Sequence, residues 1–330
     1  MAQEVNPHDA FLKKGLDSPQ RAGVFLRESL PESVVSKLSD EDPQPLETTY
    51  IEASLRETRS DKLFQAWFND GLPVYIYVLI EHKSVPDPKT PLQLLDYMQQ
   101  IWRRHVEQDA KGQAERMRHL PPIIPLVIYN GPSEWTVPLS VLECMDADER
   151  LRELQSQFGY QVRHLRPDES DESYSQDPAL RAVLRALAWA YVQNLTRDDL
   201  VRLLQDLPAG HPLEKPLLVY IARVYGSFRE ADMRYALEQV RHEEQAEELR
   251  MTVAEEWIKR GKEQGRQEGR LEAGGELLLM QLQDKFGSEA AERHRQQVEQ
   301  ADEAMIRTWS IRLLRAETVD EVFTADSLPG

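Results

Sequence analysis

Hydrophobic residues recur at two different spacings along this chain, and the change from one to the other divides it. Between residues 46 and 129, short runs rich in valine, isoleucine and aromatic residues alternate with polar turns, as they do in β-strands. After the acidic segment 168–177, apolar residues recur at helical spacing in every segment. The pattern therefore predicts a mixed α/β unit followed by an all-helical region.

The α/β unit is expected to begin with a pair of short helices within residues 7–30. Ser18 and Pro19 mark the start of the second helix, since serine caps a helix N-terminus and proline fits its first turn. The hydrophobic runs predict strands over 48–55, 60–68, 74–83 and 123–129, and a helix over 92–107. The third strand is apolar on both faces, so it is expected at the centre of the sheet, covered by helices.

The whole chain is expected to form a domain over 1–165, a helical subdomain over 178–230, a long charged helix over 231–275 and a small helical module over 276–330. Within the long helix, Gly261, Gly265 and Gly269 fall on one helical face. Each glycine costs roughly 1 kcal/mol against alanine, so the stripe needs a reason. Close approach of a partner helix in a homo-oligomer is one explanation, and a flexible charged connector is the other.

Composition narrows the class of protein. The chain of 330 residues has 40 basic and 57 acidic residues, a formal charge of −17, which argues against a protein that coats DNA by bulk positive charge. Its one cysteine, Cys144, excludes an intramolecular disulfide and a cysteine-based zinc site, and is expected to be a small buried hydrophobe. Residues 1–17 lack the apolar core of a secretory signal, and no run of ~20 apolar residues follows. A cytoplasmic protein that does not enter a membrane is therefore expected.

The candidate chemistry lies on the hairpin of the second and third strands. The turn residues 69–73 separate these strands, and a hairpin centred on Gly71 would place Asp61 opposite Glu81. Opposed residues have Cβ atoms about 4.5 to 5.5 Å apart, and Lys83, two residues further on, would share their face. This register assumes a symmetric turn, and a slip of one residue would invert the faces.

Two carboxylates at this separation repel each other by about 3 kcal/mol at an effective dielectric constant near 20. A divalent cation such as Mg²⁺ or Mn²⁺ would offset the repulsion, because these ions prefer oxygen ligands. Lys83 could then position the attacking water and balance the charge of a phosphate. The simpler interpretation is a strand that ends in solvent with an ion pair between Glu81 and Lys83.

The helix that follows adds two candidate residues, Gln93 and Tyr97, at positions i and i+4 of one face. Basic residues exceed acidic residues by five to three between positions 101 and 120, which indicates a patch that attracts phosphate. The five basic residues are Arg103, Arg104, Lys111, Arg116 and Arg118. A solvated helical face explains the same residues almost as well.

In this order, Asp61, Glu81-His82-Lys83 and Gln93-x-x-x-Tyr97 resemble the PD-(D/E)XK nuclease superfamily, in particular its RecB-like branch. Longer stretches are similar to the recombination-promoting nuclease (Rpn) family, whose members are often labelled "putative transposases": 8–14, 25–27, 59–64, 77–84 and 93–98. The resemblance covers roughly residues 5–165. The tail 277–323 resembles a small helical module often found behind such nucleases.

The resemblance implies a restriction-endonuclease-like α/β core, with a central mixed sheet flanked by helices. It also implies a bacterial Mg²⁺-dependent DNA endonuclease that is linked to recombination, mobile elements or defence. In such a site Asp61 and Glu81 would bind the metal, Lys83 would be the catalytic lysine, and Gln93 and Tyr97 would support them. Many members carry glutamine where this chain has Lys83, which matches the wider superfamily better.

An acidic residue of the first helix often completes such sites, and Asp9 is the candidate, with Glu52 as a weaker one. The alternative function is a catalytically inactive nuclease-like module that binds DNA or assembles with other proteins. The expected partners are thus DNA and further copies of the chain, the latter through the C-terminal helices.

Overall fold

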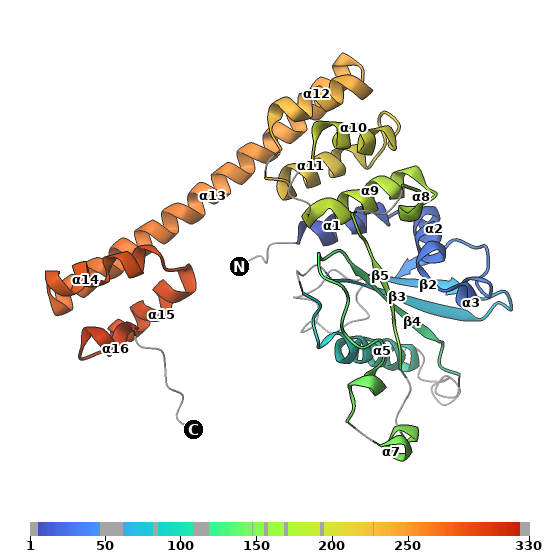
Figure 1. The fold of residues 1–330 in the computed structure, drawn as a ribbon, viewed down its shortest axis with the longest axis horizontal. Helices are drawn as coiled ribbons and strands as arrows, with labels where there is room; N and C mark the ends of the chain where they lie inside the picture. Colours follow the sequence, from blue (N-terminus) through green and yellow to red (C-terminus); the bar gives the residue numbers. More distant parts are fainter. Residues whose placement is uncertain are drawn as a thin grey trace. The chain divides into compact units, whose positions relative to one another are not determined.

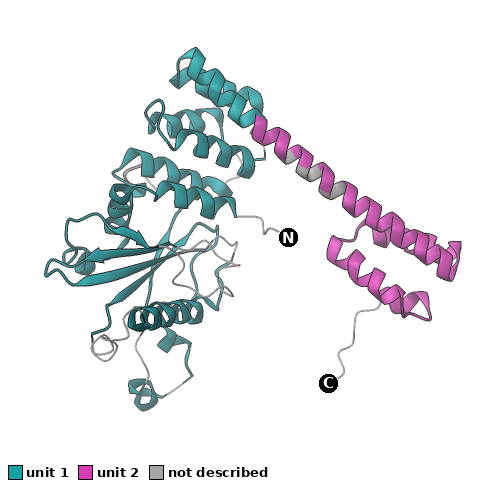
Figure 2. Ribbon diagram, turned by 180° about the vertical axis from the view of Figure 1, so that it is seen from behind, with its two compact units in different colours: residues 1–254 teal, residues 255–330 magenta. Residues whose placement is uncertain are grey.

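The computed structural model describes residues 6–46, 62–81, 85–107, 119–146, 148–154, 158–167, 171–191, 195–226 and 228–323. The chain divides into two compact units, Met1–Ala254 and Glu255–Gly330, which Figure 2 distinguishes by colour. Helix α13 (Glu243–Phe286) begins in the first unit and ends in the second. Among the helices of these described ranges, none has the length and apolar composition needed to cross a membrane.

The first unit contains a five-stranded mixed sheet in the order β1-β2-β3-β4-β5. The strands are Gln44–Leu46, Lys62–Trp67, Pro73–Glu81, Ile123–Tyr129 and Gln161–His164. The first three pair antiparallel, and β3, β4 and β5 pair parallel. The mixed sheet and the central position of β3 confirm the expected α/β fold. The predicted strand over 48–55 lies outside the described residues, whereas β5 was not predicted.

The β2–β3 hairpin is centred on Asp70, so the predicted register is wrong by two residues. Lys62 pairs with Val78, whereas a hairpin centred on Gly71 would place it opposite Ile80. The turn is tighter than expected because the Asp70 carboxylate accepts a hydrogen bond from the Leu72 amide, while Gly71 adopts a φ of 83°. A shift of two residues moves the opposed pairs but leaves every side chain on its predicted face.

Helices cover both faces of the sheet (Figure 1). Helices α1 (Pro7–Gly15) and α2 (Pro19–Ser29) confirm the predicted helix pair, and the Ser18 side chain caps α2 by accepting from the Arg21 amide. They lie on one face with α9 (Pro178–Ala188), and α5 (Thr90–Glu107) covers the other. The short elements α3 (Glu32–Val35), η2 (Val141–Cys144) and α7 (Glu149–Glu153) complete this part.

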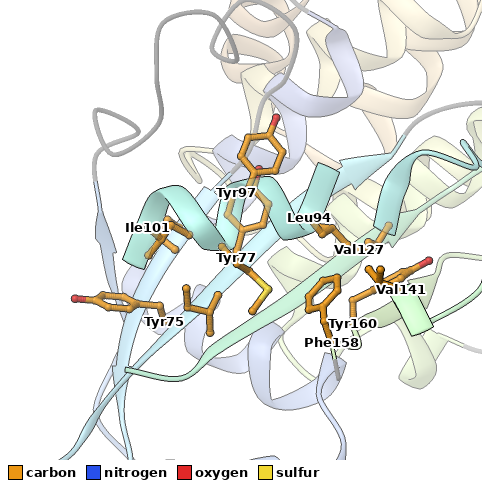
Figure 3. Close-up of a cluster of buried hydrophobic side chains, with 12 residues drawn as sticks. Tyr75, Tyr77, Leu94, Tyr97, Ile101, Val127, Val141, Phe158 and Tyr160 are labelled. Carbon is orange, nitrogen blue, oxygen red and sulfur yellow. The ribbon is translucent and has the colours of Figure 1, made fainter. Parts of the chain in front are cut away.

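A core of buried side chains lies between α5 and the sheet (Figure 3). Its members on α5 recur at helical spacing, as predicted, and are Leu94, Tyr97, Met98 and Ile101. The sheet contributes Tyr75, Tyr77 and Val127, whose numbers alternate along their strands. Cys144, in contrast, is exposed, so its predicted burial is wrong. It ends a short 3₁₀ turn whose one buried residue is Val141.

The rest of the first unit is helical, as predicted. It contains α8 (Asp171–Tyr174), α9, η3 (Trp189–Tyr191), α10 (Arg197–Gln205), α11 (Glu214–Val224) and α12 (Glu230–Val240). Helix α1 packs against α9 and α11, which attaches these helices to the sheet. Arg241 ends α12 in an extended conformation, and its buried side chain bonds to Glu214. The helix expected over 231–275 is therefore two helices, and α13 continues without a break to residue 286.

The second unit has its own core. The end of α13 packs with α14 (Ser288–Glu299), α15 (Glu303–Leu313) and α16 (Val319–Phe323) around Leu278, Leu282 and Trp309. The glycine repeat lies in the continuous helical part of α13, and a Cβ added at any of its three glycines would meet no described atom within 4 Å. The described residues therefore provide no internal packing reason for the repeat.

Candidate nuclease active site

The predicted catalytic residues fall mostly outside the described residues. Asp61 and Lys83 are not described, and Glu81 is described only as the last backbone position of β3. Their meeting at one metal ion therefore stays a prediction. The structure does describe the strands that lead to these positions, together with Gln93, Tyr97 and Asp9.

The sheet brings the candidate strand ends to one edge. Glu81 pairs with Tyr129 of β4, and Tyr129 pairs with His164 of β5, so three parallel strands end in one row. Antiparallel β2 begins at Lys62, directly after Asp61, and Lys62 pairs with Val78, three residues before Glu81. A strand rises about 3.3 Å per residue, so Lys62, as the partner of Val78, lies ~10 Å along the strand direction from that row. Open α/β sheets generally bind ligands at the carboxyl ends of parallel strands.

An ion pair anchors the start of β2 to the turn between α1 and α2. The ammonium of Lys62 lies 2.9 Å from Asp17, which also bonds to Lys14 at 3.1 Å. Burial acts to raise the pKa of Asp17, but the hydrogen bonds from Lys62 and Lys14 outweigh it and hold the pKa below its ordinary value. The chain segment next to Asp61 is thus attached to the helical layer.

Replacing Asp17 by asparagine is expected to lower the free energy of unfolding by ~0.5 kcal/mol near neutral pH, since pairs this exposed contribute little. Because the folded-state pKa of Asp17 is lowered, its stabilisation is complete above the unfolded pKa of about 3.9 and is lost as the pH falls through the folded value. Urea unfolding should therefore separate Asp17→Asn from wild type near pH 7 and not near pH 2. An equal difference at both pH values would contradict this account.

Tyr97 is part of the core as well as a candidate site residue. Its side chain is buried, and its ring stacks on Tyr77 with centroids 4.9 Å apart. In Figure 3 the hydroxyl points away from the centre of the cluster. Gln93 lies one turn earlier on α5 and is half-buried. The ring therefore stabilises the fold, and the hydroxyl is the polar group of Tyr97 that could take part in chemistry.

The two functions of Tyr97 can be separated by substitution. Tyr97→Phe keeps the stacked ring and should change the free energy of unfolding by no more than ~1 kcal/mol, whereas Tyr97→Ala should cost ~3 to 5 kcal/mol. If the hydroxyl serves the active site, Tyr97→Phe should also reduce DNA cleavage about tenfold, or ~1.4 kcal/mol of barrier. Urea unfolding and plasmid cleavage measured on one preparation test both parts. Unchanged cleavage by Tyr97→Phe would remove Tyr97 from the site.

The remaining predicted residues are only partly described. Asp9 is buried on α1, which belongs to the helical layer on the face opposite α5, while Glu52 is not described. In the predicted basic patch, Arg103 and Arg104 are exposed on α5, and the other three residues are not described. Within the part of the chain that the structure describes, no three histidine, cysteine or acidic side chains form a metal-binding group.

Sequence reasoning missed a polar pocket at the carboxyl ends of β4 and β5. Asn130, Gly131 and Glu134 contribute from the loop after β4, and His164 and Arg166 from the end of β5. In the sequence, the motif Asn130-Gly131-Pro132 indicates only the end of the strand predicted over 123–129. The alternation of Tyr160, Val162 and His164 is a β-strand signal, but a four-residue strand is too short for its pattern to distinguish it from a helical segment.

A mixed five-stranded sheet, covered by helices on both faces and followed by helices, defines an α/β protein with a nuclease-like fold. The sequence model of the family described as "Putative transposase, YhgA-like" matches residues 6–212, and the chain belongs to this family. No solved structure is significantly similar to the chain.

Among known proteins, the chain is similar to recombination-promoting nucleases and nuclease-like proteins of Escherichia coli. It is 34% identical to recombination-promoting nuclease RpnD of strain O157:H7 over 40% of this chain and 49% of that protein. It is 33% identical to recombination-promoting nuclease RpnA of strain K12 over 45% of this chain and 48% of that protein. The chain thus spans about half the length of these two. It is 27% identical to "inactive recombination-promoting nuclease-like protein RpnE" of strain K12 over 86% of this chain and 92% of that protein.

Proposed function

We propose that this chain is a divalent-metal-dependent DNA endonuclease with a role in recombination. One observation carries the proposal: β3 ends at Glu81 in the middle of the sheet edge, and antiparallel β2 starts at that end directly after Asp61. The similarity to RpnD and RpnA supports it, because both are named recombination-promoting nucleases.

In the proposed site, Asp61 and Glu81 hold Mg²⁺ or Mn²⁺, whose hard character suits carboxylate oxygens. The metal ion would lower the pKa of a bound water and neutralise charge on the scissile phosphate. Lys83 would orient that water or stabilise the phosphate, while Gln93 and the hydroxyl of Tyr97 would contribute from α5. Association of copies through the C-terminal helices is a further part of the proposal.

A second candidate function is a catalytically inactive nuclease-like module that binds DNA or other proteins. RpnE is named inactive, and its match extends over 86% of this chain, including the helical region. Sequence similarity to nucleases therefore does not guarantee activity.

Supercoiled plasmid incubated with purified protein separates the two functions. The endonuclease proposal expects nicked or linear product with Mg²⁺ or Mn²⁺ and none with EDTA. DNA binding without any cleavage, in several divalent metals, would favour the inactive module. Thermal unfolding adds a measurement independent of turnover, because Mn²⁺ should raise the melting temperature of wild type and not of Asp61→Asn.

A further inference from the structure

The pocket at the carboxyl ends of β4 and β5 has the properties of a binding site. Its volume is about 360 Å³, near the lower end of the ~300 to 1,000 Å³ typical of small-molecule pockets. Its walls combine polar groups with rings: Asn130, Gly131, Glu134, His164, Arg166 and Tyr191. A pocket of this size and composition suits one polar, ring-containing group of about the size of a nucleotide.

The position of the pocket relates it to the candidate active site. His164, in its wall, belongs to the same row of the sheet as Glu81, with Tyr129 between them. Adjacent strands lie about 4.8 Å apart, so the backbones of these two positions are separated by ~10 Å. One nucleotide advances about 3.4 Å along a strand of B-DNA, so this separation spans up to about three stacked nucleotides, and fewer when the strand is extended. A DNA strand cleaved beside Glu81 could therefore place a nucleotide close to the scissile phosphate in the pocket.

A chain of hydrogen bonds fixes the orientation of His164. Its Nε2 lies 2.9 Å from the carbonyl oxygen of Gly131, and its Nδ1 lies 3.4 Å from Nε of Arg166. A carbonyl can only accept and a guanidinium can only donate, so Nε2 donates to Gly131 and Nδ1 accepts from Arg166. His164 thus connects the loop after β4 to the guanidinium of Arg166 and acts as a positioning residue.

Arg166 is held in the pocket wall by a weak partner. Its Nη2 lies 2.7 Å from Glu134, and the two side chains are 47% and 71% exposed. Ion pairs this exposed contribute only ~0 to 1 kcal/mol. A phosphate offers the guanidinium a stronger charge-assisted interaction in matching geometry. A phosphate group can therefore displace Glu134 at little cost.

We propose that this pocket binds one nucleotide of the DNA strand, close to the phosphate that is cleaved. Arg166 would exchange Glu134 for the phosphate of the bound nucleotide, and the base would lie against the ring of Tyr191. Glu134 would act as a gate that occupies Arg166 until DNA arrives. The inference rests on the proposed function, but it concerns binding and is measured separately from cleavage.

The test measures binding of a fluorescein-labelled DNA duplex in EDTA by fluorescence anisotropy. Arg166→Gln is expected to raise Kd about tenfold and to reduce the salt dependence of log Kd by about one phosphate contact. Glu134→Gln is expected to lower Kd about threefold, because it frees Arg166. The opposite signs are the key result, since a purely structural ion pair would give the same sign for both.

The second unit offers a matched control. Arg295 and Glu292 lie 2.9 Å apart with side chains 48% and 70% exposed, almost the same as Arg166 and Glu134. Arg295→Gln and Glu292→Gln make identical charge changes and should leave Kd within about twofold of wild type. If the control variants shifted Kd as much as Arg166→Gln and Glu134→Gln do, net charge would explain the effect and the inference would be overturned.

A competition experiment tests whether the pocket accepts a nucleotide or only its phosphate. Deoxyadenosine monophosphate should displace labelled DNA from wild type more strongly than inorganic phosphate at equal ionic strength. This advantage should disappear in Tyr191→Ala, provided that the variant melts like wild type. If Tyr191→Ala does not melt like wild type, Tyr191→Leu is used in its place. Equal competition by the two anions in wild type would contradict the nucleotide assignment.

The outcomes for the pocket and for the nuclease remain distinguishable. Opposite shifts of Kd without any plasmid cleavage would support the pocket while the proposed enzymatic function fails. Cleavage by wild type with unchanged Kd in both Arg166→Gln and Glu134→Gln would overturn the pocket and leave the endonuclease proposal intact. Failure of wild type to bind DNA would overturn the pocket.

Discussion

Glu81→Gln is expected to abolish metal-dependent DNA cleavage, with a loss on the order of 10³-fold or more, or ~4 kcal/mol of barrier. The substitution preserves the size of the side chain and its place at the end of β3, and removes the negative charge proposed to bind the metal. Initial rates of plasmid nicking over a range of Mg²⁺ concentrations provide the measurement. A weakened site should also require more metal for half-maximal rate.

The companion variants Asp61→Asn and Lys83→Ala should each cause a comparable loss, because metal ligands and the lysine act on the same phosphate. Asp96→Asn serves as the matched control: it removes one acidic charge from the exposed face of α5, and its rate should equal that of wild type. Full activity in Glu81→Gln would refute the assignment of this residue as a metal ligand. Full activity in each of Glu81→Gln, Asp61→Asn and Lys83→Ala would show that the site does not lie on the β2–β3 hairpin.

Arg241→Met is expected to destabilise the first unit by ~3 to 5 kcal/mol, the range for breaking a buried ion pair. Arg241 and Glu214 are only 4% and 6% exposed. The guanidinium also donates to the carbonyl oxygens of Leu204 and Leu207, at 3.1 and 2.7 Å. Removing it takes away the cationic partner of a buried carboxylate, to which the Gly210 amide still donates, and the shared donor of two carbonyl groups. At roughly 2 to 4 °C per kcal/mol, the melting temperature of this unit should fall by about 10 °C.

The double variant Arg241→Met/Glu214→Leu tests the cause of this loss. Replacing both partners leaves no uncompensated charge, so part of the stability should return. The exposed pair of Lys215 and Glu248, 2.7 Å apart with 54% and 68% exposed side chains, is the control, and Lys215→Met should leave the free energy of unfolding close to that of wild type. Urea unfolding followed by a probe of the first unit gives the comparison. A double variant less stable than Arg241→Met would contradict the electrostatic explanation.

The pattern of the sequence predicted most elements whose apolar residues repeat over several turns or along a long strand. Strand β4 has the predicted bounds of Ile123–Tyr129, because seven mostly apolar residues followed by Asn-Gly-Pro leave few alternatives. Helix α5 was predicted within two residues of its start, since its buried residues repeat at helical spacing. Ser18 and Pro19 fixed the start of α2 through local backbone chemistry.

Some errors arose where distant residues determine the local structure, and others where a single hydrogen bond or a short turn determines it. Arg241 interrupts the predicted long helix at a position where its side chain is buried against Glu214, a contact between residues 27 positions apart. The hairpin register depended on whether the turn is centred on Asp70 or Gly71, which the hydrogen bond from Leu72 to Asp70 decides. Cysteine is a residue type that is usually buried, but Cys144 lies at the end of a short 3₁₀ turn and is exposed.

For the candidate site, the sequence determined the residue types and the order of Asp61, Glu81, Lys83, Gln93 and Tyr97 along the chain, because strand periodicity and turn chemistry are local properties. Only the tertiary structure decided which strand ends share an edge. The parallel pairing of β3, β4 and β5 places Glu81, Tyr129 and His164 in one row, although they are up to 83 positions apart. The pocket beside this row arises from the same pairing. Its residues have no common local pattern, since only the packing of distant segments brings them together.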